Sequence, residues 1–222
     1  MGSCVTALDN PGGARLVENS GEQRILARDQ RIPKRGKAAL DAFYRRAVPV
    51  GRPLLFLDFD DVLCLQKPYG GHHLFQAHSE RPGDLWERLW HPPAAQTLVD
   101  IVEEHRPHIV ITTSWLRLMD RDGFIALFHR TGLGVVADGL HEAWKAPQDR
   151  GRTRQQAIET WLYAQYEGQP LVILDDELSG TGLHGSRLDK AGCVVLCSAG
   201  VGLHAGHLPA VRSALIGGGG RL

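Results

Sequence analysis

The sequence contains no apolar stretch of the roughly 18 residues that a membrane span requires, and no apolar signal-peptide core near its N-terminus. Its four cysteines, Cys4, Cys64, Cys193 and Cys197, are scattered and form no CxxC pair. This pattern argues against a disulfide framework and is typical of a reducing compartment. We therefore expect a cytoplasmic protein that has no membrane partner.

The sequence also lacks a net charge, but its charges are unevenly distributed. Residues 1–52 hold ten Lys/Arg against five Asp/Glu, which leaves 15 against 20 for the rest of the 222 residues. Such a basic arm can bind nucleic acid, an acidic partner or anionic lipid, or it can be a solvated, poorly ordered terminus. Nucleic acid is thus one candidate partner of the arm, although few aromatic residues lie among its basic ones and no RNA-recognition module is readable.

The composition divides the chain into three parts. Residues 1–52 form the basic arm, in which the pattern of residues 37–46 predicts a short amphipathic helix. Residues 53–216 have the length and hydrophobic content of one α/β domain with a sizeable core. Residues 217–222 begin with four glycines and are expected to form a flexible tail.

A short apolar run, Leu54–Leu57, stops abruptly at the carboxylates Asp58, Asp60 and Asp61. Such a run predicts a strand buried on both faces, as in a parallel sheet that helices cover. Because Asp58 and Asp60 are two residues apart, their side chains point the same way in extended backbone. Like charges at such a place repel each other, and a divalent cation is the simplest compensation. The alternative is an acidic turn that caps the next helix.

Two further apolar segments, at residues 108–112 and 171–174, are also predicted to be strands that end in polar side chains. These polar residues are Thr112, Thr113, Asp175 and Asp176. Because strands alternate with helices, we expect an α/β fold with a doubly wound, mostly parallel, Rossmann-like sheet of about five strands and helices on both faces. The carboxyl ends of such strands meet at one edge, where ligands bind.

Other segments are assigned from weaker patterns. Residues 134–138 are predicted to form the third strand, residues 141–152 a loop, and Cys193–Cys197 the fifth strand. Thr153 is expected to cap a helix that carries Arg154 in its first turn.

Residues 64–93 are predicted to be a long irregular segment, of the kind that forms lids and binding loops. In it, Trp86 and Trp90 stand at helical spacing and are expected to be core contacts rather than a stacking platform. His72 and His73 have no cysteine partner at zinc-like spacing, so they are weak evidence for a metal site.

Four segments, in this order, resemble the four motifs of the haloacid dehalogenase (HAD) superfamily. The first motif corresponds to Asp58–Val62 and the second to Ile109–Thr112. The third corresponds to Arg154 and the fourth to Asp175–Asp176. More narrowly, residues 111–115, 154–162 and 173–176 look like HAD domains associated with bacterial RNA-repair proteins. The resemblance spans about residues 54–204.

This resemblance implies a Mg²⁺-dependent phosphomonoester hydrolase that acts through an aspartyl-phosphate intermediate. Asp58 would be the nucleophile, and Asp60 would protonate the leaving oxygen and then deprotonate the hydrolytic water. Thr112, Thr113 and Arg154 would bind the phosphate and stabilise its developing charge. The substrate would be a phosphorylated compound, such as a nucleotide or a nucleic-acid end.

The resemblance also implies a magnesium site made of oxygen ligands. Asp58, the backbone carbonyl of Asp60, and Asp175 would hold the ion, with Asp176 bound directly or through water. The basic residue of the third motif has two alternatives to Arg154, namely Lys145 and Arg152.

Asp61 is a departure from the family pattern, since the superfamily usually has Gly at this position. This puts the geometry of the turn and the reach toward substrate in doubt, and it leaves Asp61 without a role. It also keeps open a different class of function, a non-catalytic phosphate-binding or interaction module on the same fold.

Overall fold

The structure is a computed structural model that describes residues 51–216. The predicted helix at residues 37–46, the predicted tail at residues 217–222 and almost all of the basic arm lie outside these residues. Within residues 51–216, no helix combines the length and the apolar character needed to cross a membrane.

Five parallel strands form one sheet in the order β3-β2-β1-β4-β5. The strands are β1 Leu54–Leu57, β2 His108–Ile111, β3 Leu140–Lys145, β4 Leu171–Asp176 and β5 Val194–Cys197. The chain starts in the centre, builds β2 and β3 on one side, and then crosses over to β4 and β5 on the other. This confirms the predicted doubly wound sheet. The strand order reverses between β1 and β4, and open α/β sheets bind their ligands at such a point.

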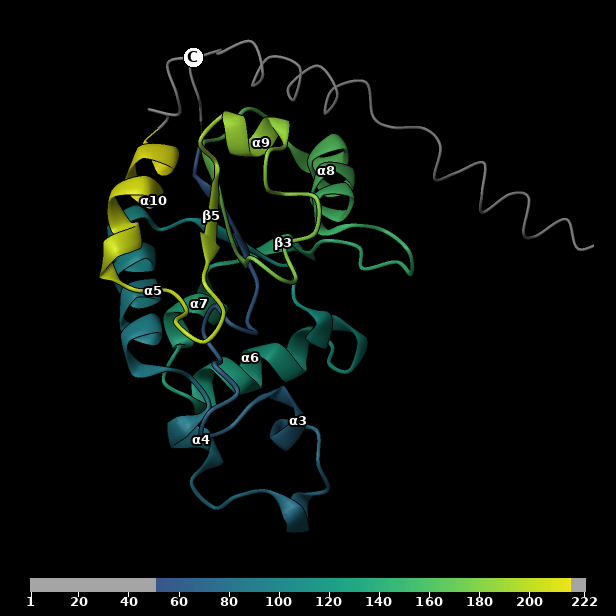
Figure 1. The fold of residues 1–222 in the computed structure, drawn as a ribbon, viewed down its shortest axis with the longest axis vertical. Helices are drawn as coiled ribbons and strands as arrows, with labels where there is room; N and C mark the ends of the chain where they lie inside the picture. Colours follow the sequence, from purple (N-terminus) through teal and green to yellow (C-terminus); the bar gives the residue numbers. More distant parts are fainter. Residues whose placement is uncertain (1–50, 217–222) are drawn as a thin grey trace, which may run out of the picture. The chain divides into compact units, whose positions relative to one another are not determined.

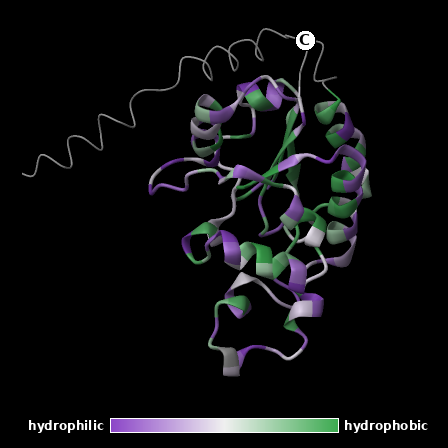
Figure 2. Ribbon diagram, turned by 180° about the vertical axis from the view of Figure 1, so that it is seen from behind, coloured by the Kyte–Doolittle hydropathy of each residue, from purple (hydrophilic) through white to green (hydrophobic). Residues whose placement is uncertain are grey.

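Helices cover both faces of this sheet (Figure 1). The longer helices are α5 Pro92–His105, α6 Arg121–Arg130, α8 Arg154–Gln165 and α10 Leu208–Leu215, and the short ones around the sheet are α7 Gly134–Asp138 and α9 Arg187–Lys190. Alternate residues of β1 serve the two faces. Leu55 and Leu57 pack toward α5 and α10, whereas Leu54 and Phe56 pack toward α8. Figure 2 shows the strands as mostly hydrophobic and the helices as mixed.

Two predictions near the third strand are wrong. Residues 134–138 form helix α7, and the strand is Leu140–Lys145, inside the segment predicted to be a loop. A short apolar run does not distinguish a helix from a strand, and Val136 and Ala137 are buried in helical conformation. β3 lies at the edge of the sheet and is mostly half-buried or exposed, so it lacks the apolar run that marked the central strands.

The segment at residues 64–93 is less irregular than predicted. It contains α3 Gly71–Leu74, a 3-10 helix His78–Glu80 and α4 Leu85–Arg88, and it lies beyond the carboxyl ends of the strands, near α6 (Figure 1). Trp90 is buried, with its ring centroid 5.5 Å from that of Phe59, so its assignment to the core is confirmed. Trp86 is half-buried against the same core.

Candidate active site

Asp58 lies between Thr112 and Asp175 at the carboxyl edge of the sheet. Leu57 is in register with the last residue of β2 on one side and with Leu174 of β4 on the other. The Asp58 N–H donates to the Leu174 carbonyl at 3.0 Å, and the Thr112 N–H donates to the Leu57 carbonyl at 2.9 Å. The pairing of the strands therefore brings three of the predicted site residues to one level of the edge, at the switch point.

Arg154 is the basic side chain that contacts Asp58. Its side chain is buried, with Nη2 3.3 Å from Asp58 Oδ1 and Nε 2.8 Å from Asp175 Oδ2. Thr153 caps α8, as predicted, and the Arg154 N–H donates to Thr181 Oγ1 at 2.9 Å. These contacts fix the first turn of α8 against the loop after β4, which directs the guanidinium toward both carboxylates.

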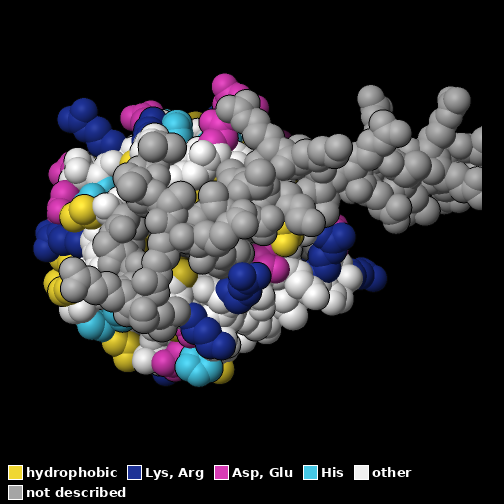
Figure 3. Space-filling view, turned by 90° about the horizontal axis from the view of Figure 1, so that it is seen from above, with side chains coloured by type: hydrophobic (Ala, Val, Ile, Leu, Met, Phe, Trp, Pro, Cys, Tyr) yellow, Lys and Arg dark blue, Asp and Glu magenta, His cyan; other side chains and the backbone are white. Residues whose placement is uncertain are grey.

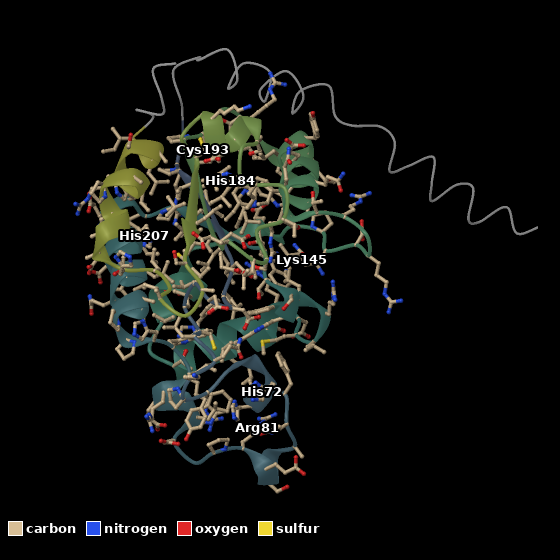
Figure 4. The ribbon with its side chains drawn as sticks, in the orientation of Figure 1. His72, Arg81, Lys145, His184, Cys193 and His207 are labelled. Carbon is tan, nitrogen blue, oxygen red and sulfur yellow. The ribbon has the colours of Figure 1, made fainter. Side chains whose placement is uncertain are left out.

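The other two candidates for the basic position lie elsewhere. Lys145 is exposed at the end of β3, where its Nζ is 5.3 Å from the centroid of the Trp144 ring (Figure 4). Arg152 is also exposed and pairs with Asp149 at 3.4 Å. Of the three alternatives, Arg154 is the one that the fold brings to Asp58.

Ser179 is a member of the site that sequence reasoning missed. Its Oγ is 2.9 Å from Asp58 Oδ2, 3.1 Å from Asp175 Oδ1, and also within hydrogen-bond distance of Asp176. A hydroxyl has one proton to donate, so it satisfies one of these oxygens at a time. The remaining close oxygen pairs need a proton on a carboxyl or a cation between them. Its place shortly after Asp175 in the sequence did not show that it reaches Asp58, 121 positions away along the chain.

The carboxylates at this edge repel each other in a buried place. Burial raises the pKa of Asp58 to about 6, although Arg154 and the hydrogen bond from Ser179 act to lower it. Burial and the charge of Asp58 raise the pKa of Asp175 well above its ordinary value, and Arg154 again opposes the rise. One guanidinium is therefore too little positive charge for the cluster.

The residues present fit a magnesium ion. Within residues 51–216, one group of three metal-ligating side chains converges, with carboxylate oxygens of Asp58, Asp175 and Asp176 within 4.8 Å of one another. His72 and His73 are not part of it. All three carboxylates are buried, their donors are all oxygen, and their charge is incompletely balanced, which are the conditions that a hard divalent cation meets.

The carboxylate of Asp60 has other hydrogen-bond partners than that of Asp58, and one of them belongs to the segment 64–93. Trp115 Nε1 donates to its Oδ2 at 2.9 Å, Gln66 Nε2 donates to its Oδ1 at 2.8 Å, and the Ser114 hydroxyl lies 3.4 Å away. Burial raises the pKa of Asp60, and these hydrogen bonds act against the rise. Trp115 and Gln66 were missed from the sequence, because nothing in their spacing shows that they face Asp60.

Thr112 and Thr113 use their hydroxyls differently. Thr112 is fully buried, and its Oγ1 has no hydrogen-bond partner among the described residues. Thr113 caps the 3-10 helix Ser114–Arg117, and its Oγ1 accepts from the Trp115 N–H at 3.4 Å. The free hydroxyl at this edge is therefore that of Thr112.

Asp61 has a structural role that the sequence did not reveal. Its φ is +53°, in the left-handed region where glycine is usual and where aspartate is tolerated better than most residues. Its Oδ1 accepts from the Gly200 N–H at 2.9 Å, and the Leu203 N–H donates to the Val62 carbonyl at 2.8 Å. The left-handed turn is thus formed without glycine, and Asp61 joins it to the loop after β5.

The family comparison agrees with this geometry. The model of the HAD domain in Swiss Army Knife RNA repair proteins matches residues 54–208, which is more than half of the chain. The chain belongs to this family. Membership in this HAD family confirms the resemblance and supports a HAD-type hydrolase. No curated protein and no solved structure shows significant similarity to the chain.

The raised pKa of Asp58 predicts how the metal-free HAD domain responds to pH. A carboxyl whose pKa rises from 3.8 to about 6 on folding stabilises the fold when protonated, and this stability is lost as the pH rises through 6. Asp58→Asn mimics the neutral form. In EDTA at pH 7.5 the variant should therefore be more stable than the wild type, by on the order of 2–3 kcal/mol.

Urea denaturation at several pH values measures this difference. It should shrink as the pH falls from about 7 to 5, because the wild-type carboxyl then takes up its own proton. A difference that is absent at pH 7.5, or that grows on acidification, would contradict the burial that we describe for Asp58.

A second prediction concerns the turn at Asp61. Asp61→Ala should destabilise the protein by about 1–2 kcal/mol, since alanine is strained at a positive φ and the bond to Gly200 is lost. Asp61→Asn keeps the acceptor oxygen, and asparagine also tolerates a positive φ. Its free energy of unfolding, measured by urea denaturation, should therefore be close to that of the wild type. Equal stability of the alanine variant and the wild type would show that this turn needs no special residue.

Proposed function

We propose that this chain is a Mg²⁺-dependent phosphomonoester hydrolase in which Asp58 attacks phosphorus and forms an aspartyl-phosphate. The observation that carries the proposal is the contact of buried Asp58 with Arg154 at 3.3 Å, beside the carboxylates of Asp175 and Asp176 at the switch point of the sheet. A carboxylate held in place and partly neutralised by a guanidinium is suited to approach an anionic phosphate.

Arg154 and Thr112 are suited to hold the phosphate. The Arg154 Nη1 atom is buried and has no hydrogen-bond partner among residues 51–216, and the same holds for Thr112 Oγ1. Both can donate to oxygens that gain charge as the phosphoryl group is transferred. Thr113, whose hydroxyl already caps a helix, would contribute its backbone N–H instead.

Asp60 is suited to act as the general acid and base. Its raised pKa favours the protonated form that must donate to the leaving oxygen, and the same carboxyl would then accept a proton from the attacking water. The hydrogen bonds from Trp115 and Gln66 hold it in one orientation. Asp58 and Asp60 thus divide the work, because one faces the guanidinium and the other faces the segment 64–93.

Mg²⁺ would be held by Asp58, Asp175, Asp176 and the backbone carbonyl of Asp60. When bound, it would supply positive charge that lowers the repulsion between an incoming phosphate and these carboxylates.

We further propose that the phosphate belongs to a nucleotide or a nucleic-acid end. The family description refers to RNA repair proteins, and the basic arm at residues 1–52 carries the charge that phosphate backbones attract. On the visible part of the face in Figure 3, Lys/Arg and Asp/Glu side chains are interspersed. The excess of Lys/Arg over Asp/Glu in residues 1–52 makes the arm our candidate for sequence-independent contact with a strand.

Hydrolysis of 4-nitrophenyl phosphate and of short phosphorylated oligonucleotides tests the mechanism. Activity should require Mg²⁺, and Asp58→Asn should lower kcat by at least about a thousandfold because the nucleophile is gone. Asp100→Asn, the same change at an exposed position of α5, is the matched control and should keep full activity.

Two results would contradict the proposal. One is a wild type that is inactive on a broad panel of phosphomonoesters, which would favour a non-catalytic phosphate-binding module. The other is an Asp58→Asn variant with undiminished activity, which would exclude this nucleophile.

A further inference from the structure

A hollow lies outside the Asp58 site, between α3, α4 and α6. Its volume is about 310 Å³. Of the side chains that line it, Leu74 and Leu127 are buried, and Phe75 and Trp86 are half-buried. Leu118 also lines the hollow and is 64% exposed. The hollow thus presents an apolar and aromatic surface to which a flat, apolar chemical group can bind.

Two guanidinium groups give the same hollow a positive charge. Arg81 and Arg130 both line it, and none of the described residues that line it is acidic. The Arg130 Cζ lies 3.9 Å from the centroid of the Trp86 ring, so the guanidinium and the indole are stacked. Arg81 is tied to the chain by a 3.0 Å hydrogen bond from its Nε to the Gln76 carbonyl, in the segment beyond the sheet (Figure 4). Neither contact neutralises a positive charge, so an uncharged apolar ligand would leave both guanidinium groups without an anion.

The hollow is connected to the proposed general acid through one side chain. Trp115 donates from Nε1 to Asp60 at 2.9 Å, and its ring centroid is 5.7 Å from that of Phe75. Helix α3 begins directly on this indole, because a Cβ at Gly71 would lie 2.7 Å from Trp115 Nε1. The wall of the hollow and the support of Asp60 are therefore the same packed unit, Gly71–Phe75 with Trp115.

We propose that this hollow binds a nucleotide of the substrate strand, with the base on the apolar side chains near Trp86 and a backbone phosphate at Arg81 and Arg130. This inference rests on the proposed function, since the terminal phosphate of the same strand would be the group cleaved at Asp58. A flat base together with an anion is the combination that stacked aromatic and arginine side chains recognise in single strands. Trp86 packs on the core and carries the Arg130 guanidinium on its ring, so it holds that cation in place for the strand.

Binding of tetra-adenylate RNA to the full chain tests the proposal. One strand carries a 5′-phosphate and another a 3′-phosphate, and each is compared with the same strand from which the inner bases are removed. Binding is measured by fluorescence anisotropy, in EDTA so that no turnover occurs. One of the two phosphorylated strands will bind the wild type more tightly. That strand should bind about tenfold more tightly than the same strand without its inner bases. Trp86→Leu should remove most of this preference.

Arg130→Gln is the second variant, because Arg130 is exposed and its replacement leaves the core intact. It should weaken binding about fivefold or more, and reduce the slope of log K against log salt concentration by about 0.7, the value for one phosphate contact on a single strand. Arg121→Gln on the same helix, at an exposed position outside the hollow, is the matched control and should stay within about twofold of the wild type.

Equal affinity for base-containing and abasic strands, or an Arg130→Gln variant that binds like Arg121→Gln, would overturn the proposal. So would the absence of strand binding by a protein whose hollow binds an apolar fluorescent dye, which would favour an uncharged apolar ligand for this surface. Failure of the proposed function is distinguishable, because it would appear as loss of phosphate hydrolysis while the base preference and the Arg130 effect persist.

Discussion

The crowding of carboxylates around Asp58 is the constraint on which the site depends. Asp58, Asp175 and Asp176 are buried at one strand edge, and Arg154 is the cation that contacts two of them. Such an arrangement is costly unless a proton, a metal ion or a substrate completes it. The fold brings these carboxylates together because β1 and β4 are buried, in-register neighbours, so Asp58 and Asp175 follow paired residues at one edge. A site that is unstable when empty is well placed to respond to an ion and a phosphate.

Different segments of the chain contact the two carboxyls of the first motif. Asp58 depends on α8 and the loop after β4, whose contacts through Thr181 and Ser179 orient the guanidinium and fill the space between the acids. Asp60 depends on Trp115 and on the segment 64–93. Phe59 between them packs edge-on against four buried aromatic rings, those of Trp90, Trp115, Phe124 and Phe128. Its burial separates the two carboxyls and holds each in its own surroundings.

The sequence predicted the central strands and the meeting of Asp58, Thr112 and Asp175 at one edge, because buried parallel strands leave apolar runs and their polar ends share one edge. Arg154 was assigned from the family resemblance, with Lys145 and Arg152 as alternatives. Prediction from the sequence failed where the apolar signal is weak. The edge strand β3 has few buried residues, and α7 is too short for its period to be read. Ser179, Trp115 and the tie between Asp61 and Gly200 depend on contacts between distant loops. No local pattern encodes such contacts.

The central claim, that Asp58 receives a phosphoryl group beside a magnesium ion, is tested most directly by thermal denaturation with Mg²⁺ and beryllium fluoride, a mimic of an aspartyl-bound phosphoryl group. We expect a rise in Tm beyond that caused by Mg²⁺ alone, absent in Asp58→Asn. Asp60→Asn should keep this rise, because it retains the backbone carbonyl and the nucleophile while losing turnover. A rise that persists without the Asp58 carboxylate, or that is missing in the wild type, would contradict the claim.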